Sequence, residues 1–449
     1  MCMSDWRKRS AGLWRRVHEL PAERRGAVAV IFVIALVPLV AAGGAAIDIS
    51  RAYVVKQRLG FAIDAAALAV GSATGSEDEL SQIMLRFFQA NYPANEVGVP
   101  ATPSMSIVDN VVTITASAEV NATLMRIVGV NNISVAARTE VVRETKGLEV
   151  VLVLDNTGSM AGSKIASLKT AATDFTNILF GRETIATNLK IGIVPFAGSV
   201  NIGTSRQSPY TTGASAASYL PTTWGGCVEA RNNVVPTDEE DTWVNNTSHR
   251  WRRYLWPPHA TRNRWPPVTS TAGPNKQCPV EVLPLTAVKS QITTKIGAMA
   301  ASGVTHINLG AAWGWRLLSP TEPFTEGRPY GDPNYNKAIV IMTDGENFIS
   351  NVFGEYSAYG NLSEGRLGTT RLGSAVTALN NRLLTVCTRM KALDIIVYTI
   401  TFQSTPAAFA VMRDCASDPA KAFESPTNAD LERTFRAIGA QLSNLRLGR

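Results

Sequence analysis

The sequence contains little histidine and cysteine, the residue types on which many catalytic and transition-metal sites depend. It has four histidines and five cysteines among 449 residues, and no two cysteines have the C-x-x-C spacing. The histidines offer no convincing pairing of a nucleophile with a base, which argues against the common hydrolase arrangements. We therefore expect that the chain is not an enzyme and that it holds no Cys/His metal cluster.

Charge is also scarce and unevenly placed. Charged residues make up 18% of the chain, and the formal net charge is +7. Residues 1–25 contain seven basic and three acidic residues, which leaves a net charge of only +3 on the other 424 residues. A protein that binds nucleic acid usually carries its basic excess on a folded domain. We therefore expect no nucleic-acid partner.

Charge is absent altogether from residues 26–47, GAVAVIFVIALVPLVAAGGAAI. As a helix this run would measure roughly 33 Å, which is enough to cross the hydrocarbon core of a bilayer. A cleaved signal peptide is the alternative, but its apolar stretch is typically shorter, at about 7–15 residues. Because basic residues stay on the cytoplasmic side, we predict a single-pass anchor with residues 1–25 as a cytoplasmic tail and everything after Asp48 exported.

The cysteines agree with export. Four of the five follow the apolar run: Cys227, Cys278, Cys387 and Cys415. Four cysteines can pair in three ways, and the sequence alone does not choose between them. We favour Cys227 with Cys278 and Cys387 with Cys415, since each pair closes a local loop. Free buried thiols are the alternative, which an oxidising compartment disfavours.

Two short regions separate the apolar run from the main domain. Residues 48–75 predict an amphipathic helical stalk, because Ile47, Val54, Leu59, Ile63 and Leu68 recur at roughly helical spacing. Residues 76–145 predict a small α+β module. Its helix starts near Ser76, and its strand alternates apolar with polar residues from Val112 to Val120, after a turn at Asp109-Asn110.

From residue 146 to 449 the pattern changes to apolar strands that alternate with helices. LEVVLVLD, LKIGIVPFA, KAIVIMTDG and DIIVYTITF are strands of the kind buried on both faces of a parallel sheet. The alternation predicts a doubly wound, Rossmann-like α/β domain with a mostly parallel sheet. Ligands of such sheets gather at the carboxyl ends of the strands.

An insertion at about residues 205–284 interrupts this alternation, and it is too long for a structureless loop. It is rich in Trp and Arg, which are enriched at interaction hot spots. The candidate partner surface comprises Trp243, Trp251, Arg252, Arg253, Trp256 and Trp265. In the alternative interpretation the Trp rings fill a small core and the Arg stems cover it.

Oxygen-bearing side chains stand where three separate strands or loops meet helices. Asp155-Asn156-Thr157-Gly158-Ser159 follows the first apolar strand, Asp344 ends the strand KAIVIMTDG, and Thr305 lies in ASGVTHINLG. At one strand-to-helix junction alone, an Asp with Ser or Thr is often only a helix cap. Three such positions at one end of a sheet favour a common site.

These residues resemble the metal-ion-dependent adhesion site of von Willebrand factor A-type (vWA) domains, with Thr157 where that pattern usually has Ser. The resemblance implies that Asp155, Thr157, Ser159, Thr305 and Asp344 are the ligand set. Hydroxyls and carboxylates suit a hard divalent cation, Mg²⁺ first and Ca²⁺ or Mn²⁺ as alternatives. With two anionic ligands, the ion would keep a positive charge and an open position for a partner's carboxylate.

The N-terminal segment resembles the TadE/TadG-like proteins of Tad (Flp-type) pilus assembly. The likeness lies in Arg-Arg-Gly before the apolar run, Pro38 within it, and Gln57 and Asp64-Ala-Ala-Ala-Leu-Ala after it. It implies a bacterial inner-membrane protein whose vWA domain binds pilus-assembly or envelope partners in the periplasm. The alternative is a membrane-bound vWA component of an ATPase-linked chaperone or metal-insertion complex. Ile31 stands near the position where pilin-like relatives carry Glu, so we expect a permanent anchor.

Overall fold

The chain folds into two compact units, Met1–Arg143 and Glu144–Arg449. The computed structural model describes residues 24–73, 77–93, 97–108, 111–142, 146–231, 237–257, 273–352 and 354–445. Residues 1–23 of the predicted cytoplasmic tail, Ser76, the Asp109-Asn110 turn and Trp265 lie outside these ranges. The division falls within two residues of the predicted start of the main domain at residue 146.

A single helix, α2 (Arg24–Gly71), contains both the apolar run and the predicted stalk, and Pro38 lies inside it. By length and composition, Val28–Gly71 is able to cross a membrane. The large apolar side chains from Val28 to Val40 are between 43% and 67% exposed. A helix that exposes such residues on all sides is suited to lipid rather than to water.

The sequence analysis predicted a separate helical stalk at residues 48–75. Residues 48–71 instead continue the same helix and are not a separate stalk. They form the core of the first unit, because one face of α2 is covered by a sheet and by helix α3 (Glu77–Asn91). The buried residues on that face are Ala52, Val55, Leu59, Ala62, Ile63, Ala66, Ala67 and Val70. Of the predicted apolar stripe, only Leu59 and Ile63 are buried, while Ile47, Val54 and Leu68 are exposed. The small alanine side chains let the sheet approach the helix closely, and contact with the sheet determines which face of the helix is buried.

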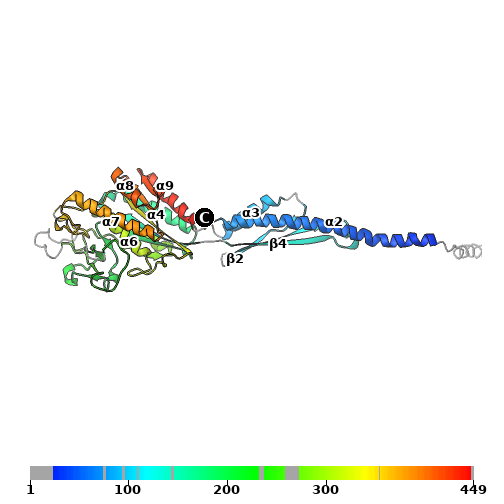
Figure 1. Cartoon of the computed structure of the whole chain (residues 1–449), viewed down its shortest axis with the longest axis horizontal. Helices are drawn as coiled ribbons and strands as arrows, with labels where there is room; N and C mark the ends of the chain where they lie inside the picture. The colour runs from blue at the N-terminus through cyan, green and yellow to red at the C-terminus, as the bar shows by residue number, and fades with distance from the viewer. Residues whose placement is uncertain are drawn as a thin grey trace, which may run out of the picture. The chain divides into compact units, whose positions relative to one another are not determined.

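The first unit is an α+β module, as predicted. Its other elements are α3 (Glu77–Asn91), β1 (Val99–Pro100), β2 (Ser104–Val108), β3 (Val111–Asn121), the 3₁₀ turn η1 (Met125–Val128) and β4 (Asn132–Val142). The strands form an antiparallel sheet in which β3 pairs with β1, β2 and β4. Alternate residues of β3 are buried from Val112 to Val120, which confirms the predicted half-buried strand. Figure 1 shows α2 running beside β4 and continuing beyond the sheet.

The second unit is built around an eight-stranded mixed sheet, ordered β14-β13-β12-β5-β6-β7-β9, with β11 also paired to β6. The strands are β5 (Gly147–Asp155), β6 (Leu189–Phe196), β7 (Val200–Asn201), β9 (Cys227–Val228), β11 (Leu283–Thr286), β12 (Tyr335–Thr343), β13 (Ile396–Phe402) and β14 (Ala422–Ser425). The five strands from β14 to β6 are parallel, while β7 and β11 pair antiparallel with β6 and β9 pairs antiparallel with β7. The predicted α/β fold with a mostly parallel sheet is confirmed.

Helices cover both faces of this sheet, which is the doubly wound arrangement. The helices are α4 (Ser163–Phe180), α5 (Lys289–Ala298), α6 (Ile307–Leu318), α7 (Leu372–Ala392), α8 (Pro406–Cys415) and α9 (Asn428–Leu445). One core contains α4, α5 and α9 with one set of alternate strand residues. The other contains α6, α7 and α8 with the opposite set. Every residue of β5 is therefore buried.

The insertion at residues 205–284 does not form an independent subdomain. Its β9 and β11 extend the main sheet, and a further pair, β8 (Thr211–Thr212) and β10 (Trp251–Arg252), forms a two-stranded sheet. Tyr219, Trp224 and Trp251 of the insertion belong to the same apolar core as Trp313 of α6. Aromatic residues thus attach the insertion to the domain.

Candidate metal centre

The two aspartates of the predicted site are neighbours because their strands are neighbours. Asp155 is the last residue of β5, and Asp344 directly follows β12. The two strands are parallel and adjacent, with Met342 opposite Leu154. Their carboxyl ends therefore lie side by side at one edge of the sheet.

A chain of hydrogen bonds joins four of the five predicted ligands. The Thr157 and Ser159 hydroxyl oxygens are 2.9 Å apart, and Ser159 Oγ donates to Asp344 Oδ1 at 2.6 Å. Asp155 Oδ1 accepts from the Thr157 N–H at 2.8 Å, and its Oδ2 accepts from Thr343 Oγ1 at 2.8 Å. The hydroxyls thus point toward the aspartates.

Helix capping does not explain these hydroxyls. Thr157 precedes a short 3₁₀ turn, η2 (Gly158–Met160), but its side chain makes no capping hydrogen bond. The N-cap residue of α4 is Gly162. The side chains of Thr157 and Ser159 therefore face the aspartates without serving a helix end.

Thr305, the fifth predicted ligand, is brought to this edge of the sheet by its backbone. The segment before it bonds to the Asp155 loop, because Ser302 N–H donates to Asn156 O at 2.7 Å and Gly158 N–H donates to Gly303 O at 2.9 Å. The carbonyl of Thr305 accepts from the Phe348 N–H at 2.8 Å. Within the described residues, no hydrogen bond joins its hydroxyl to the other four.

The site brings two buried carboxylates close together. The side chains of Asp155 and Asp344 are both almost completely shielded from solvent. Burial, reinforced by the negative charge of Asp344, raises the pKa of Asp155 to about 6. An arrangement of this kind is stabilised by any cation that sits between the carboxylates.

Lys164 supplies one such positive charge, and the sequence analysis missed it. Its Nζ lies 2.7 Å from Asp344 Oδ2, and its side chain is 24% exposed. It follows Ser159 by five residues on the first turn of α4. Thr343 was also missed, although it stands directly before Asp344. A basic residue close behind the Asp-x-Thr-x-Ser pattern was the available signal for Lys164.

The residues present fit a hard divalent cation. The donors are carboxylate and hydroxyl oxygens, which Mg²⁺, Ca²⁺ and Mn²⁺ accept. In the part of the chain that the structure describes, no group of three or more His, Cys, Asp and Glu residues is placed so that it could hold a metal ion. The chemistry of this site thus depends on hydroxyls together with only two carboxylates.

Two polar side chains beside the site have no partner among the described residues. Both side-chain polar atoms of Asn156 and both ring nitrogens of His306 are buried without a hydrogen bond. Burial lowers the pKa of His306 to about 3, so the ring is neutral at physiological pH. It packs edge-on against Tyr359 with ring centroids 5.3 Å apart. We interpret His306 as a structural residue that holds the conformation of the Thr305 loop by packing against Tyr359.

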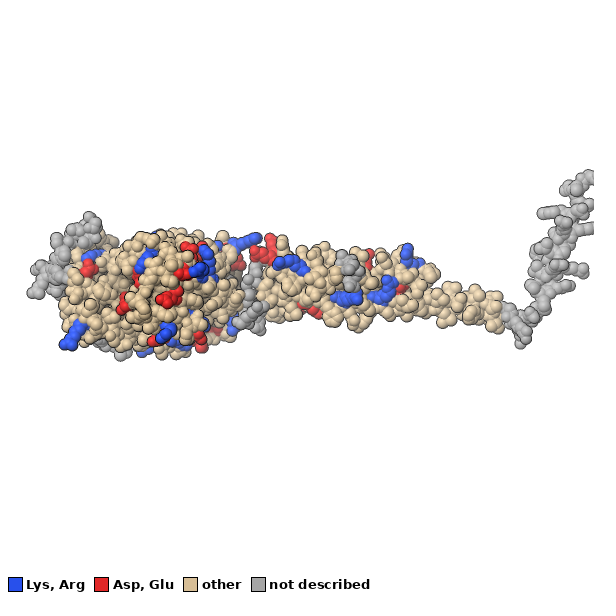
Figure 2. All heavy atoms as spheres, turned by 90° about the horizontal axis from the view of Figure 1, so that it is seen from above, with Lys and Arg blue, Asp and Glu red and all other residues tan. Residues whose placement is uncertain are grey.

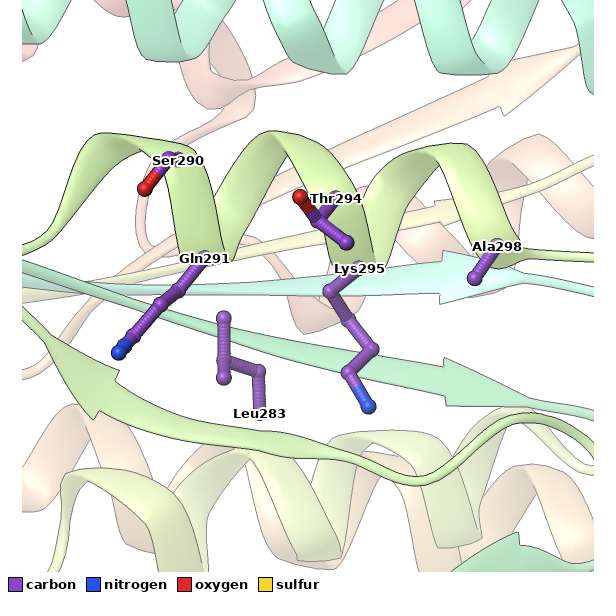
Figure 3. Close-up of a pocket in the computed structure, with 6 residues that line it drawn as sticks. All are labelled: Leu283, Ser290, Gln291, Thr294, Lys295 and Ala298. Carbon is purple, nitrogen blue, oxygen red and sulfur yellow. The ribbon is translucent and has the colours of Figure 1, made fainter.

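A hollow of about 380 Å³ lies elsewhere on the second unit, between β11 and α5. Figure 3 shows its six lining residues, Leu283, Ser290, Gln291, Thr294, Lys295 and Ala298. Lys295 is the one ionisable group among them. Most of the surface that the six residues expose to the hollow belongs to apolar atoms. No predicted site residue belongs to this hollow.

The predicted Trp/Arg partner surface is wrong for its central members. Trp251 and Trp256 are buried, with 1% exposure each. Trp251 packs in the apolar core that includes Trp313 of α6, and Trp256 packs in a smaller cluster with Tyr254 and Tyr356. Arg253 stacks on Trp224 and bonds to Thr211. The alternative interpretation, in which Trp rings fill a core that Arg stems cover, describes this region better.

The two peripheral members differ from these three. Trp243 is half-buried and packs on Tyr210, with ring centroids 4.8 Å apart. Arg252 is exposed and lies 3.7 Å from Glu229. Neither forms a continuous surface with Trp251 or Trp256, whose rings point into the core.

Both favoured disulfides are present. Cys227 of β9 is joined to Cys278 within the insertion, and Cys387 of α7 is joined to Cys415 of α8. Each pair closes a loop on its own side of the domain, with sequence separations of 51 and 28 residues. Disulfides persist in oxidising compartments.

Comparison with known proteins identifies the N-terminal segment. Residues 26–73 match the family described as "Putative Flp pilus-assembly TadE/G-like". The match covers α2 from its third residue and the two residues that follow the helix. A comparison with curated proteins found no match.

Solved structures resemble this chain in fold at low sequence identity. The vWF domain of the type V pili tip protein Mfa5 from Porphyromonas gingivalis is 11% identical, with a TM-score of 0.38, and the match covers 68% of this chain and 97% of that one. The pilus adhesin SpaC from Lactobacillus rhamnosus GG is 13% identical with a TM-score of 0.39, over 78% of this chain and 34% of that one. A von Willebrand factor type A structure from Catenulispora acidiphila is 10% identical with a TM-score of 0.30, over 76% and 47%. This chain thus spans about a third of the SpaC adhesin and about half of the last.

Residues 26–73 are therefore a TadE/G-like segment of the Flp pilus-assembly type, and the unit after residue 143 is an α/β domain with a mixed sheet.

Proposed function

We propose that this protein is a membrane-anchored, metal-dependent binding protein that acts in Tad/Flp pilus assembly or surface adhesion. Its α/β domain binds a divalent cation, Mg²⁺ first, through Asp155, Thr157, Ser159, Thr305 and Asp344. A carboxylate of a pilus-assembly or cell-envelope protein completes the coordination of that cation. The role is binding and not catalysis.

The hydrogen-bonded series Thr157–Ser159–Asp344 carries this proposal. Ser159 and Asp344 are 185 residues apart in the chain, yet their oxygens are 2.6 Å apart. Oxygens that converge in this way from separate loops are preorganised for one ion. In such a site the fold holds the loops in place before the metal binds, so the metal does not have to order them.

The charge of the site explains why a partner's carboxylate would be bound. Two carboxylates balance the two positive charges of a divalent cation, and the hydroxyl ligands add no negative charge. Asp344 also shares its charge with Lys164, which lies 2.7 Å away. The site thus keeps a positive character at the open end of the sheet, where an acidic side chain of a partner would be attracted.

The location that fits this role is the bacterial inner membrane, crossed once by the first part of α2. The Tad-family segment and the apolar helix support a membrane anchor. The basic residues before it favour a cytoplasmic N-terminus, and both disulfides of the second unit favour a periplasmic domain.

Thermal unfolding of the full chain in detergent tests the metal site. Saturating Mg²⁺, at about 100 times its Kd, would stabilise the folded state by ~2.7 kcal/mol, or about 4 °C for a unit of this size. Asp344→Asn should lose this Mg²⁺-dependent rise, because a neutral amide cannot bind the cation strongly. Asp414→Asn removes a charge from an exposed carboxylate of the same unit and should retain it.

An equal Mg²⁺-dependent rise in Asp344→Asn and Asp414→Asn would count against the site. Co-purification from native membranes, with and without chelator, then identifies the partner. We expect a protein that is captured by the wild type and by Asp414→Asn with Mg²⁺, and that is lost with chelator or in Asp344→Asn.

A further inference from the structure

One loop of the first unit exposes apolar side chains beside the anchor helix. It comprises residues 124–130, Leu-Met-Arg-Ile-Val-Gly-Val, which connect β3 to β4 and include η1. Ile127 is 72% exposed and Val128 is 55% exposed. We call these residues the tip loop. Nothing in the candidate metal centre involves them.

The tip loop is fastened to α2 at the end of the apolar run. The buried carboxylate of Asp48 accepts hydrogen bonds from the backbone N–H groups of Thr123, Leu124 and Met125, at 2.8 to 3.0 Å. Leu124 also packs on Gly44, where an added Cβ would lie 2.6 Å from the Leu124 Cβ. The loop is therefore held level with residues 44–48 of the helix.

The sheet confirms that this is the end of the unit that faces the apolar run. Gly71, at the other end of α2, lies against Val141 near the end of β4. Residues 44 to 71 cover roughly 40 Å of helix, and the strand pairs from Asn121 with Asn132 to Val111 with Val142 cover roughly 33 Å. Helix and sheet thus run together, with the tip loop at the end from which residues 28–43 project.

The projecting part of the helix carries no charge. Figure 2 shows its described residues without blue or red atoms on the face in view, followed by charged residues on the wider part of the unit. Asp48 and Arg51 are the first charged residues after Arg25. Arg51 bonds to Thr123 and lies 3.9 Å from Asp48, directly beside the tip loop. The boundary between lipid and water thus falls at the level of the tip loop.

We propose that the tip loop is a second membrane contact, in which Ile127 and Val128 enter the outer interface of the same bilayer that α2 crosses. Arg126 and Arg51 lie at the level of the lipid head groups, where cationic side chains are favoured next to anionic lipids. Two contacts, the helix and a loop about 80 residues later, fix the orientation of the first unit on the membrane. This proposal rests on the proposed membrane anchor, and it does not depend on the metal centre.

Fluorescence of a membrane-sensitive dye tests the contact in the full chain. The protein is reconstituted into vesicles of phosphatidylcholine and phosphatidylglycerol (3:1), with Cys2→Ser as background so that the two disulfides keep the other cysteines unreactive. The dye is placed at Ile127→Cys, at Val142→Cys and at Val33→Cys. Val142 is 66% exposed and lies at the opposite end of the same sheet, which makes it the matched control.

The expected result is a blue-shifted emission at position 127, and quenching by nitroxide-labelled lipid at least twofold stronger than at position 142. Strong quenching at position 33 together with equal, weak quenching at 127 and 142 would overturn the tip-loop contact and leave the anchor. A blue shift at 127 without lipid quenching would assign the loop to a protein neighbour and overturn the proposal. Absence of quenching at position 33 would remove the anchor and the contact together.

Discussion

Lys164 places an ammonium group where a divalent cation would compete with it. Its Nζ lies 2.7 Å from Asp344 Oδ2, and the Asp344 carboxylate also accepts from Ser159. In the absence of metal, this ion pair holds Asp344 in place. Bound metal would have to share Asp344 with the lysine or displace it, so we expect Lys164 to weaken the affinity that two carboxylates and three hydroxyls would otherwise give.

Lys164→Met should therefore tighten Mg²⁺ binding by about tenfold, which corresponds to ~1.4 kcal/mol. The reason is that methionine keeps the apolar stem but removes the competing charge. Titration calorimetry with Mg²⁺ or Mn²⁺ measures the change. Lys169→Met on the same helix is the control for net charge, because Lys169 bonds to the Gly297 carbonyl and not to a carboxylate.

Equal affinities in Lys164→Met and Lys169→Met would show that the lysine does not compete. Looser binding in Lys164→Met would mean that the lysine organises the site for the metal. Either result would leave the ligand set itself in place, since that is tested separately by Asp344→Asn.

At the scale of elements, α6 and the insertion are joined by a buried arginine. Arg316 of α6 is completely buried and donates to the carbonyls of Asp238 and Glu240, at 2.8 and 3.1 Å. Its guanidinium stacks on Trp251 of the insertion and on Trp313 of its own helix, with 5.1 and 4.6 Å to the ring centroids. Burial, with a contribution from nearby Arg231, lowers the pKa of Arg316 to about 10, which leaves it charged at neutral pH.

Arg316→Met should lower the free energy of unfolding by about 3 kcal/mol, because it leaves buried carbonyls unpaired and removes one cation beside the Asp238 carboxylate. Urea unfolding of the full chain in detergent measures the loss. Arg413→Met, at a half-exposed position on α8, should change the stability by less than about 0.5 kcal/mol. A loss of similar size in both variants would show that the Arg316 network does not hold the insertion.

The same contacts show why the partner-surface prediction failed. Trp and Arg are common at interfaces, and they are also what joins an insertion to a domain when a guanidinium stacks between rings. Composition alone does not separate these cases, because both place Trp beside Arg. The deciding fact is the position of Trp251 against Trp313, which are 62 positions apart in the chain and have ring centroids 4.7 Å apart.

At the scale of the whole molecule, the orientation in the membrane separates the pilus role from the alternative of an ATPase-linked complex. A component that works with a cytoplasmic ATPase presents its vWA domain to the cytoplasm. Residues 1–25 carry a net charge of +4 out of the net +7 of the chain and lie directly before the apolar run, so the domain is expected on the opposite side.

Alkaline phosphatase fused after Arg449 should therefore be active, because this enzyme acquires its disulfides only outside the cytoplasm. The same reporter fused after residue 25, before the apolar run, should be inactive and serves as the control. Activity measured in intact cells gives the result. An inactive fusion after Arg449, with the chain intact by immunoblot, would contradict the periplasmic location.

The sequence by itself determined the parts of this protein that depend on local pattern. Buried strands such as LEVVLVLD can be recognised in the sequence because most of their residues are apolar. Asp155 and Asp344 stand at the ends of two such strands. The uncharged run at residues 26–47 likewise needs no tertiary context, since its length and composition alone suit a bilayer.

Only the tertiary structure decided what depends on distant neighbours. It set which face of residues 48–71 is buried, since a sheet that begins at Val99, 28 residues after Gly71, covers that face. It brought Lys164 to Asp344, put Trp251 and Trp256 in the core, and left the Thr305 hydroxyl without a bond to the other ligands. Local pattern reports which residues are apolar or charged, but packing between segments far apart in the chain chooses their partners.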